Sequence, residues 1–343
     1  MKALIYHGPG ELSVEERDIP EPGPGEVLIK VLAVSVCGSD LGAYRLPEVS
    51  DRWKPPIVLG HEFAGDIAAV GEGVKSLKTG QRVAACPILY CGDCFYCNQG
   101  LINLCNGRRS LGTSIGGEAA DGAMQEYFTL REEAVIPLDD RLSYTQGALL
   151  EPLAVCYCAA KRAARPGETA AVIGAGPIGL MTVKFLKAQG AKAVFASDIS
   201  EVRLGFAEKY GAAGINVKNE PLDAKIMEMT GGIGVDRVII AADTPTAFDD
   251  SFKIVRNGGD IVLVALMHHH VTLDPMQLVG RGVSLLGSYM FTGEQREVMR
   301  MIAEKEIFID DLITSEYGIE DGPAVFKSLC SADCRDVKVI MNM

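Results

Sequence analysis

The sequence has few of the features that mark membrane proteins or nucleic-acid-binding proteins. Among its 343 residues the longest nearly uncharged run is TAAVIGAGPIGLMTV. This run is shorter than the about 20 residues that span a bilayer, and Gly and Pro interrupt it. Only 33 Lys and Arg stand against 45 Asp and Glu, so the net charge is −12. Nucleic acids and anionic membranes both favour clustered cations, and we expect neither as a partner.

The first residues, MKALIYHGPGELSVEERD, also lack the apolar core of a signal peptide. We therefore expect a cytoplasmic protein, in which thiols stay reduced. Hydrophobic residues make up 48% of the chain and charged residues 23%, which is the balance of a globular protein. A chain of this length can form two domains, each with its own core.

Four of the ten cysteines lie close together in CGDCFYCNQGLINLC: Cys91, Cys94, Cys97 and Cys105. In a reducing compartment, clustered cysteines bind metal more often than they form disulfides. Their C-x2-C-x2-C-x7-C spacing lets a tight turn aim four thiolates at one Zn²⁺, at about 2.3 Å from each sulfur. An iron–sulfur cluster is the alternative, but in bacterial ferredoxin motifs the fourth Cys follows after three residues and precedes Pro, whereas Cys105 precedes Asn106. We interpret the segment as a closed structural zinc site.

The pattern of apolar runs divides the chain into two regions. Residues 1 to about 150 contain short strand-like runs, such as EVLIKVLAVSV and EFAGDIAAVG, separated by Pro- and Gly-rich turns, which indicates a β-rich domain. From Ala170 on, apolar strands such as AAVIG, AVFASD and DIVLVAL alternate with helix-length segments, which is typical of a parallel, doubly wound α/β sheet. Ser143 and Gln146 resemble a capping box at the start of a helix connecting the two regions.

We therefore predict an α/β protein with two domains. The β-rich domain would comprise residues 1–150 and 286–343, with the zinc lobe at about residues 86–110. The doubly wound domain would comprise residues 151–285.

A glycine-rich segment, VIGAGPIGL, follows one of the apolar strands and opens the next helix. Its G-x-G-x-x-G pattern lets the chain turn tightly, lets the backbone approach a pyrophosphate, and lets helix and strand pack closely. The positive end of the helix dipole would face the phosphates. We assign to the cofactor site Gly174, Gly176, Pro177, Ile178 and Gly179.

Asp198 ends the next apolar strand, 19 residues after Gly179. A carboxylate at this place accepts hydrogen bonds from both hydroxyls of the adenosine ribose. The alternative is a helix N-cap before ISEVR. Strand, glycines, helix and acid together predict a dinucleotide-binding fold, and the carboxylates of Asp198 and Glu201 would repel the 2′-phosphate of NADP, which favours NAD.

A third set of residues could hold a catalytic metal. Cys37 lies in VCGSD, His61 and Glu62 lie in LGHEFAG, and Glu151 lies in LLEPLAV. A thiolate, an imidazole and a carboxylate would leave one position of a zinc ion open, as in catalytic zinc sites. Taken alone, a Cys at a strand end is more often a packed thiol.

Together these motifs resemble a known family. The motifs GHE, the four-cysteine segment, EP and GAGPIG follow one another in this order. On these motifs the sequence resembles the zinc-dependent medium-chain alcohol dehydrogenases over essentially its whole length. Within that family it resembles in particular the polyol (sorbitol-type) and threonine dehydrogenase branch. The resemblance implies a GroES-like catalytic domain and a Rossmann domain. It also implies two zinc ions per chain, NAD, a small-molecule alcohol as substrate, and a dimer or tetramer.

The resemblance also implies roles for single residues. Cys37, His61 and Glu151 would bind the catalytic zinc, and Glu62 would be a ligand in some states and a neighbour of the ligands in others. Ser39 would contact the substrate alcohol and begin proton release. Asp198 would hold the ribose. Arg203 resembles a basic residue near the adenine, and a solvated helix face is the alternative.

The sequence departs from the family pattern at two places. Gly42 stands where many relatives have a His, three residues after the relay hydroxyl, so the proton would leave through water or a cofactor hydroxyl. AADTPT replaces a segment that contains Gly in many relatives.

Three consecutive histidines, His268, His269 and His270, follow the strand DIVLVALM, whose carboxyl end would face the cofactor. One of them would approach the nicotinamide or the substrate. A second metal site is the alternative.

We thus predict a zinc-dependent oxidoreductase that transfers hydride between NAD and a secondary alcohol, with a polyol, sugar alcohol or vicinal diol favoured. Threonine dehydrogenase, sugar-phosphate dehydrogenase and simple alcohol dehydrogenase are alternatives within this class. A catalytically silent nucleotide-binding relative is the alternative of another class. The joint presence of Cys37, His61, Glu151 and Ser39 argues against it.

Overall fold

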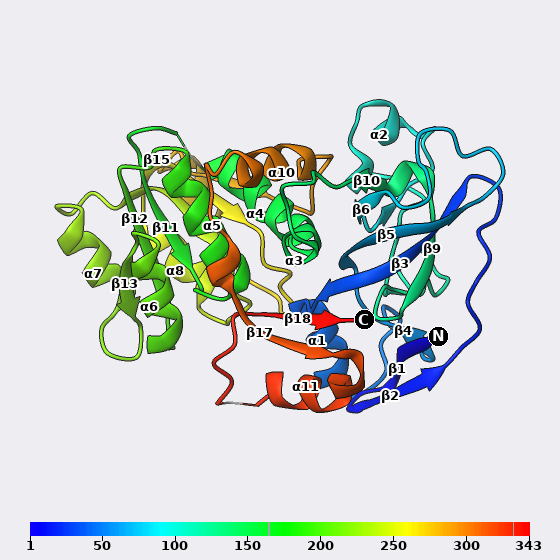
Figure 1. The fold of residues 1–343 in the computed structure, drawn as a ribbon. Helices are drawn as coiled ribbons and strands as arrows, with labels where there is room; N and C mark the ends of the chain where they lie inside the picture. Colours follow the sequence, from blue (N-terminus) through cyan, green and yellow to red (C-terminus); the bar gives the residue numbers. More distant parts are fainter. Residues whose placement is uncertain (164, 332) are drawn as a thin grey trace. The chain divides into compact units, whose positions relative to one another are not determined.

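The structure is a computed structural model, which describes residues 1–163, 165–331 and 333–343. The chain forms two compact units (Figure 1). The first unit comprises Met1–Pro152 and Gln295–Met343, and the second comprises Leu153–Glu294. The division between Pro152 and Leu153 falls inside helix α4 (Leu150–Ala163). Among the described residues, no helix combines the length and the apolar character needed to cross a membrane.

The first unit is built mainly from β-strands, as predicted. Its larger sheet has the order β10-β6-β5-β3-β18-β17, with β9 paired to β3, and all its pairs are antiparallel except β17 with β18. The strands are β3 (Glu26–Ser35), β5 (Glu62–Val70), β6 (Arg82–Ala85), β9 (Tyr127–Arg131), β10 (Val135–Pro137), β17 (Ile313–Gly318) and β18 (Lys338–Asn342). A smaller sheet has the order β2-β1-β4, from Glu11–Glu16, Lys2–Gly8 and Ile57–Val58.

Strand β3 is the centre of this unit because it pairs with β5, β9 and β18. Val27, Ile29 and Val31 on this strand are almost completely buried. Nearby, the rings of Phe63 and Phe128 meet edge to face, with centroids 5.8 Å apart. Burying a large apolar side chain contributes about 1.5–3 kcal/mol. The end of β3, which leads to Cys37, is therefore held in a tightly packed core.

Helices in the first unit are short. They are α1 (Gly38–Arg45), α2 (Phe95–Asn98), α3 (Tyr144–Ala148), α10 (Gln295–Ala303) and α11 (Gly322–Leu329), with 3-10 turns at Ile102–Leu104, Glu132–Ala134, Asp310–Leu312 and Ile319–Asp321. The predicted capping box is confirmed at the start of α3. Ser143 Oγ accepts the Gln146 backbone N–H at 3.1 Å, and Gln146 Oε1 accepts the Ser143 N–H at 3.0 Å.

The second unit is a doubly wound α/β domain, as predicted. Its six parallel strands have the order β13-β12-β11-β14-β15-β16. They are β11 (Thr169–Ile173), β12 (Ala193–Asp198), β13 (Ala213–Asn216), β14 (Val235–Ile240), β15 (Val255–Leu263) and β16 (Ser284–Gly287). The helices are α5 (Pro177–Ala188), α6 (Glu201–Lys209), α7 (Leu222–Met229), α8 (Ala247–Ile254) and α9 (Pro275–Val279), besides α4.

The strand order reverses between β11 and β14. In such sheets, ligands bind outside the carboxyl ends of the strands at this reversal. The ends are aligned here, because Ile173 lies opposite Ser197 and Ile240, and Ile240 lies opposite Leu263. The loops that follow these strands therefore meet along one edge of the sheet.

Candidate active site

Cys37 lies at the junction between strand β3 and helix α1. It is the N-cap residue of α1 and has an extended backbone, with φ −91° and ψ 152°. Its backbone N–H donates to Asp40 Oδ2 at 3.0 Å, and its carbonyl accepts the Asp40 N–H at 3.1 Å. This reciprocal contact fixes the direction of the Cys37 side chain. Ser39, next to Cys37 on the first turn of α1, is half-buried.

Asp40 is a member of the site that the sequence interpretation missed. It is 1% exposed, accepts the Gly60 N–H at 3.4 Å, and lies 3.6 Å from His61 Nδ1. Burial raises the pKa of its carboxyl above the ordinary value, against the opposing charge of His61. A carboxylate in the first turn of a helix that starts directly after a candidate ligand is the signal that could have identified it.

His61 and Glu62 stand at the start of strand β5. Gly60 precedes them with φ +93°, and a Cβ at Gly60 would lie 2.8 Å from Met124 Cγ, so glycine is required at this close approach. One ligand atom each from Cys37, His61 and Glu62 lies within 4.8 Å of the others. His61 Nδ1 is buried and has no hydrogen-bond partner among the described residues.

Lys338 is a second member of the site that the sequence interpretation missed. It begins strand β18 and is 3% exposed. Its Nζ donates to Glu62 Oε2 at 2.6 Å and to the Val36 carbonyl at 3.0 Å. Burial alone would lower the pKa of this ammonium, but the Glu62 carboxylate raises it above its ordinary value. Its only signal in the sequence is a Lys inside the apolar strand DVKVIMN.

Glu151 is the second residue of helix α4 and is 6% exposed. It is not part of the group formed by Cys37, His61 and Glu62. Burial raises the pKa of its carboxyl to about 7, against the opposing charge of His61. Glu151 is thus a buried acid whose charge interacts with that of His61.

These residues fit a bound zinc ion. Thiolate, imidazole and carboxylate are the donor types that zinc selects. The acids Asp40, Glu62 and Glu151 are all buried, and a cation would offset the excess of negative charge that Lys338 leaves. His61 Nδ1 is on the side of the Asp40 carboxylate, 3.6 Å away, so Nε2 is the ring nitrogen that a metal would take.

The four cysteines Cys91, Cys94, Cys97 and Cys105 are brought together as the sequence interpretation expected, and the structure records all ten cysteines of the chain as free thiols. Their sulfurs lie 3.5 Å apart for Cys105 and Cys91, 3.6 Å for Cys94 and Cys97, and 3.9 Å for Cys91 and Cys97. A tetrahedral zinc with sulfurs at about 2.3 Å has S···S edges of about 3.8 Å. The four thiols therefore already have the spacing of a closed zinc site.

Pairing at the base of this lobe closes it. Strands β7 (Ile88–Leu89) and β8 (Arg109–Ser110) pair antiparallel on either side of the four cysteines. Cys94 is the N-cap of helix α2, and the backbone N–H of Cys97 lowers the pKa of its thiol to about 6. A thiolate, which is the form that binds metal, is thus favoured at Cys94.

The glycine turn of the second unit has the close contacts that the motif predicts. Gly174 follows β11 with φ +98°, and a Cβ on it would lie 2.6 Å from Ala242 Cβ. A Cβ on Gly179 would lie 1.9 Å from the Gly174 carbonyl oxygen. Helix α5 begins directly after Gly176, with Pro177 and Ile178 in its first turn. Its free N–H groups are suited to a pyrophosphate.

Asp198 joins this turn to the next helix. Its Oδ2 accepts the Ala175 N–H at 2.8 Å and its Oδ1 accepts the Ser200 N–H at 2.9 Å. The N-cap of α6 is Ser200, whose hydroxyl accepts the Arg203 N–H, so the alternative of Asp198 as the N-cap is wrong. The Arg203 guanidinium lies 4.0 Å from Asp198. The carboxylate retains lone pairs for a ribose hydroxyl.

The three histidines form no metal-ligand group in the part of the chain that the structure describes. Instead, His268 and His269 both approach Asp243, which the sequence interpretation did not single out. Their Nδ1 atoms lie 2.8 Å and 3.0 Å from its carboxylate oxygens. His270 is exposed.

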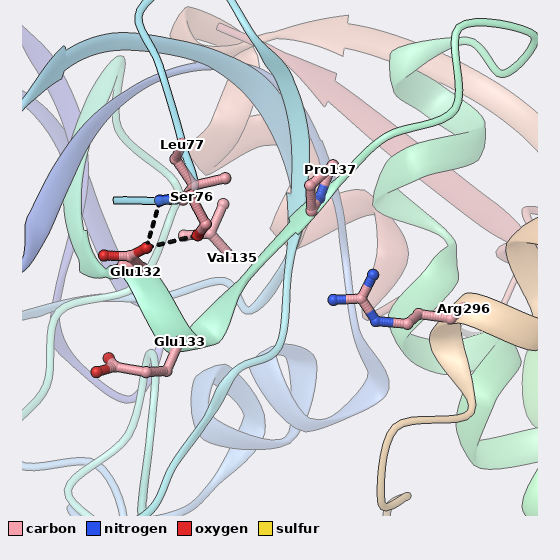
Figure 2. A pocket seen from close by; sticks show the side chains of 7 residues that line it. All are labelled: Ser76, Leu77, Glu132, Glu133, Val135, Pro137 and Arg296. Carbon is pink, nitrogen blue, oxygen red and sulfur yellow. Dashed lines mark hydrogen bonds between the residues drawn. The ribbon is translucent and has the colours of Figure 1, made fainter. Parts of the chain in front are cut away.

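A cavity of about 500 Å³ in the first unit holds none of the predicted site residues (Figure 2). Its two acids already have partners: Glu132 accepts the Ser76 N–H at 2.8 Å, and Glu133 pairs with Arg131. Figure 2 shows Arg296 on the opposite side of Pro137 from these acids. We therefore place the chemistry at the group of Cys37, His61 and Glu62, which has metal-binding donors.

The comparisons with known proteins agree with this geometry. Residues 23–140 match the alcohol dehydrogenase GroES-like domain, and residues 177–304 match the zinc-binding dehydrogenase domain. The chain belongs to the zinc-dependent medium-chain alcohol dehydrogenase family. The predicted family and fold class are thus confirmed.

Among its relatives is the sorbitol dehydrogenase of Bacillus subtilis, which is 35% identical over 93% of this chain and 91% of that protein. The L-threonine 3-dehydrogenase of Pyrococcus horikoshii is 32% identical over 92% of this chain and 91% of that protein.

Similar solved structures include a zinc-binding dehydrogenase from Sinorhizobium meliloti bound to NADP, with a TM-score of 0.91 and 29% identity. An alcohol dehydrogenase from Escherichia coli CFT073 in complex with NADH also has a TM-score of 0.91 and 29% identity. Each comparison covers 100% of this chain and 99% of the other.

Replacing Cys94 with Ser tests the cysteine lobe. We expect the Cys94→Ser variant to contain less zinc per chain and to melt several degrees lower, because a three-thiolate site binds metal more weakly and metal binding contributes to folding. Elemental analysis and thermal denaturation measure both effects. Cys334→Ser, at a thiol outside both metal-ligand groups, is the control. An unchanged zinc content in Cys94→Ser would contradict a metal site in this lobe.

Replacing Lys338 with Met tests the buried ion pair. We expect Lys338→Met to lower the free energy of unfolding by about 3–5 kcal/mol, because it leaves the Glu62 carboxylate buried without its partner. Lys338→Arg keeps the positive charge and should lower the free energy of unfolding by a smaller amount. Urea denaturation gives these values, and Lys327→Met, at an exposed position on α11, is the control. A stability of Lys338→Met equal to that of the control would show that Glu62 does not depend on Lys338.

Proposed function

We propose that the protein oxidises a secondary alcohol with NAD⁺, or carries out the reverse reaction, and that its substrate is a polyol, sugar alcohol or vicinal diol. The observation that carries the proposal is the group of half-buried Cys37 with His61 and buried Glu62, together with the buried acid Glu151. The relationship to a sorbitol dehydrogenase supports the substrate class. The relationship to a threonine dehydrogenase keeps L-threonine as the second candidate.

Two zinc ions per chain are part of this proposal. Cys37, His61 and Glu151 would bind the catalytic ion. Glu62, which Lys338 holds by a hydrogen bond, would be an alternative ligand or a neighbour of the ligands. The four cysteines of the lobe would bind the structural ion, since four thiolates leave no open position for a substrate.

When bound, zinc supplies a Lewis acid that lowers the pKa of an alcohol, and NAD⁺ supplies the acceptor for its hydride. Ser39, two residues after Cys37, would accept the hydroxyl proton of the substrate and pass it on. Gly42 offers no side chain to receive this proton from Ser39, so it would go to water or to a hydroxyl of the cofactor. Asp40 would keep the Cys37 backbone and the His61 ring in place.

The choice of NAD over NADP follows from the charges near Asp198. Its carboxylate is fixed by two backbone N–H groups and would accept hydrogen bonds from the adenosine ribose. Glu201 on the neighbouring helix is held by the Asn216 side-chain amide. A 2′-phosphate would face both carboxylates, and the Arg203 guanidinium already lies 4.0 Å from Asp198.

We also propose a homo-oligomer, a dimer or tetramer, in a cytoplasmic location. Strand β16 forms one edge of the six-stranded sheet. The helix before it, α9, exposes Met276 and Val279, and exposed apolar side chains at a sheet edge favour association with another chain. Ten free thiols fit a reducing compartment.

A substrate panel tests the function directly. We expect one or more polyols or vicinal diols to reduce NAD⁺. The absorbance of the reduced cofactor measures this reaction. L-Threonine, sugar phosphates and simple alcohols are the competing substrates. Ser39→Ala should lower kcat by about 10²–10⁴-fold and leave NADH binding unchanged, because its hydroxyl acts only on the proton of the alcohol. Turnover of no member of the panel, or full activity in Ser39→Ala, would contradict the proposal.

Replacing Asp198 with Ser tests the cofactor preference. The unmodified enzyme should have a higher kcat/KM for NAD⁺ than for NADP⁺. Asp198→Ser should weaken NAD⁺ binding by about 10-fold or more, since hydrogen bonds to a charged group contribute about 1.5–3 kcal/mol. It should also lower the ratio of kcat/KM for NAD⁺ to kcat/KM for NADP⁺. Asp223→Ser, on the first turn of helix α7, is the control for the loss of one negative charge. Equal kcat/KM values for the two cofactors in the unmodified enzyme would refute the role of Asp198.

A further inference from the structure

Two histidines converge on one carboxylate beyond the carboxyl ends of β14 and β15. His268 Nδ1 and His269 Nδ1 contact different oxygens of Asp243 at 2.8 Å and 3.0 Å. The side chain of His268 is 70% exposed, whereas that of His269 is 33% exposed. His269 Nε2 is buried and has no hydrogen-bond partner among the described residues.

The contact with Asp243 determines what His269 Nε2 can do. An ionised carboxylate has no proton to donate, so a neutral His269 ring is best placed with its proton on Nδ1, which lies 3.0 Å from Asp243 Oδ1. In a neutral imidazole the other nitrogen is then an acceptor. Burial alone would raise the pKa of Asp243, but the hydrogen bond from His268 and the nearby imidazoles hold it below the ordinary value. The pair therefore presents a fixed, buried acceptor that lacks a donor.

The place of this acceptor relative to a dinucleotide follows from the sheet. The glycine turn after β11 would hold the pyrophosphate, and Asp198 at the end of β12 would hold the adenosine ribose. The other nucleoside must then extend in the opposite direction, over the ends of β14 and β15. Asp243 and His269 lie in the loops that follow these two strands.

The position of Asp243 next to the pyrophosphate turn makes the ribose, rather than the nicotinamide ring, the group that His269 would contact. Ala242, directly before Asp243, packs so closely on Gly174 of the pyrophosphate turn that a Cβ there would lie 2.6 Å from its own Cβ. The group that follows the pyrophosphate in the cofactor is the second ribose, whose hydroxyls are hydrogen-bond donors. The nicotinamide lies one group further on.

We propose that His269, oriented by Asp243, accepts a hydrogen bond through Nε2 from a hydroxyl of the nicotinamide-side ribose of the dinucleotide. This inference rests on the proposed function, because it requires a bound dinucleotide, and it adds a cofactor contact that the glycine motif and Asp198 do not provide. Asp243 acts as a positioning residue through His269. His268 is the outer partner of the same carboxylate.

Binding of cofactor fragments to the zinc-loaded protein tests the contact without turnover. ADP lacks the second ribose, ADP-ribose contains it, and NADH contains it together with the nicotinamide. We expect His269→Ala to raise the calorimetric Kd of ADP-ribose and of NADH by about 3- to 10-fold, which is the effect of one hydrogen bond. The Kd of ADP should not change. His270→Ala, in the same segment but exposed, should leave all three unchanged.

Two further variants separate the contact from a general disturbance of the loop. His269→Gln retains an acceptor oxygen near the place of Nε2 and should recover part of the affinity for ADP-ribose. Asp243→Asn should weaken the binding of ADP-ribose and NADH by a smaller factor than His269→Ala, because the His269 ring loses its fixed orientation.

Four results would overturn the inference. An unchanged Kd of His269→Ala for ADP-ribose would exclude the ribose contact while the proposed function stands. An equal loss for ADP would place the effect at the pyrophosphate or the fold, and a loss for NADH alone would place it at the nicotinamide. Unmodified protein that binds neither NADH nor ADP-ribose would overturn the proposed function together with the inference.

Discussion

The first unit depends on a small set of charges buried in its core. Asp40, Glu62 and Glu151 are all nearly inaccessible to water, and an isolated carboxylate in such a place costs several kcal/mol. Lys338 neutralises one of them through its contact with Glu62. The contacts of these residues tie helix α1, strand β5 and strand β18 to one point next to the proposed metal ligands. The packing of the sheet therefore depends on the same buried charges that determine the electrostatics of the site.

The second unit depends on close backbone approach instead of buried charge. Gly174 and Gly179 allow contacts that any Cβ would prevent, and these contacts bring the N-terminus of α5 to the sheet edge. Asp198 then connects the glycine turn to the start of α6 by accepting two backbone N–H groups. A carboxylate fixed in this way keeps its direction before a ligand arrives, which lowers the entropy cost of binding.

Local patterns made much of this predictable. The alternation of apolar strands and helices, the capping box at Ser143 and the cysteine spacing each depend on residues near one another in the sequence. The partners of Glu62 and His269 do not. Lys338 is separated from Glu62 by 276 residues, and Asp243 is separated from His269 by 26. Such pairs arise from strand order, which a local pattern does not specify.

The buried charges also distinguish the two carboxylates proposed around the metal. Glu62 already has an ammonium partner at 2.6 Å, so its negative charge is stable inside the protein. Glu151 has no ammonium within salt-bridge distance among the described residues, and burial raises its pKa to about 7. A dication bound at Glu151 would compete there with a proton. The two buried acids therefore differ in what surrounds them: an ammonium at Glu62, and burial without a hydrogen-bonded cation among the described residues at Glu151.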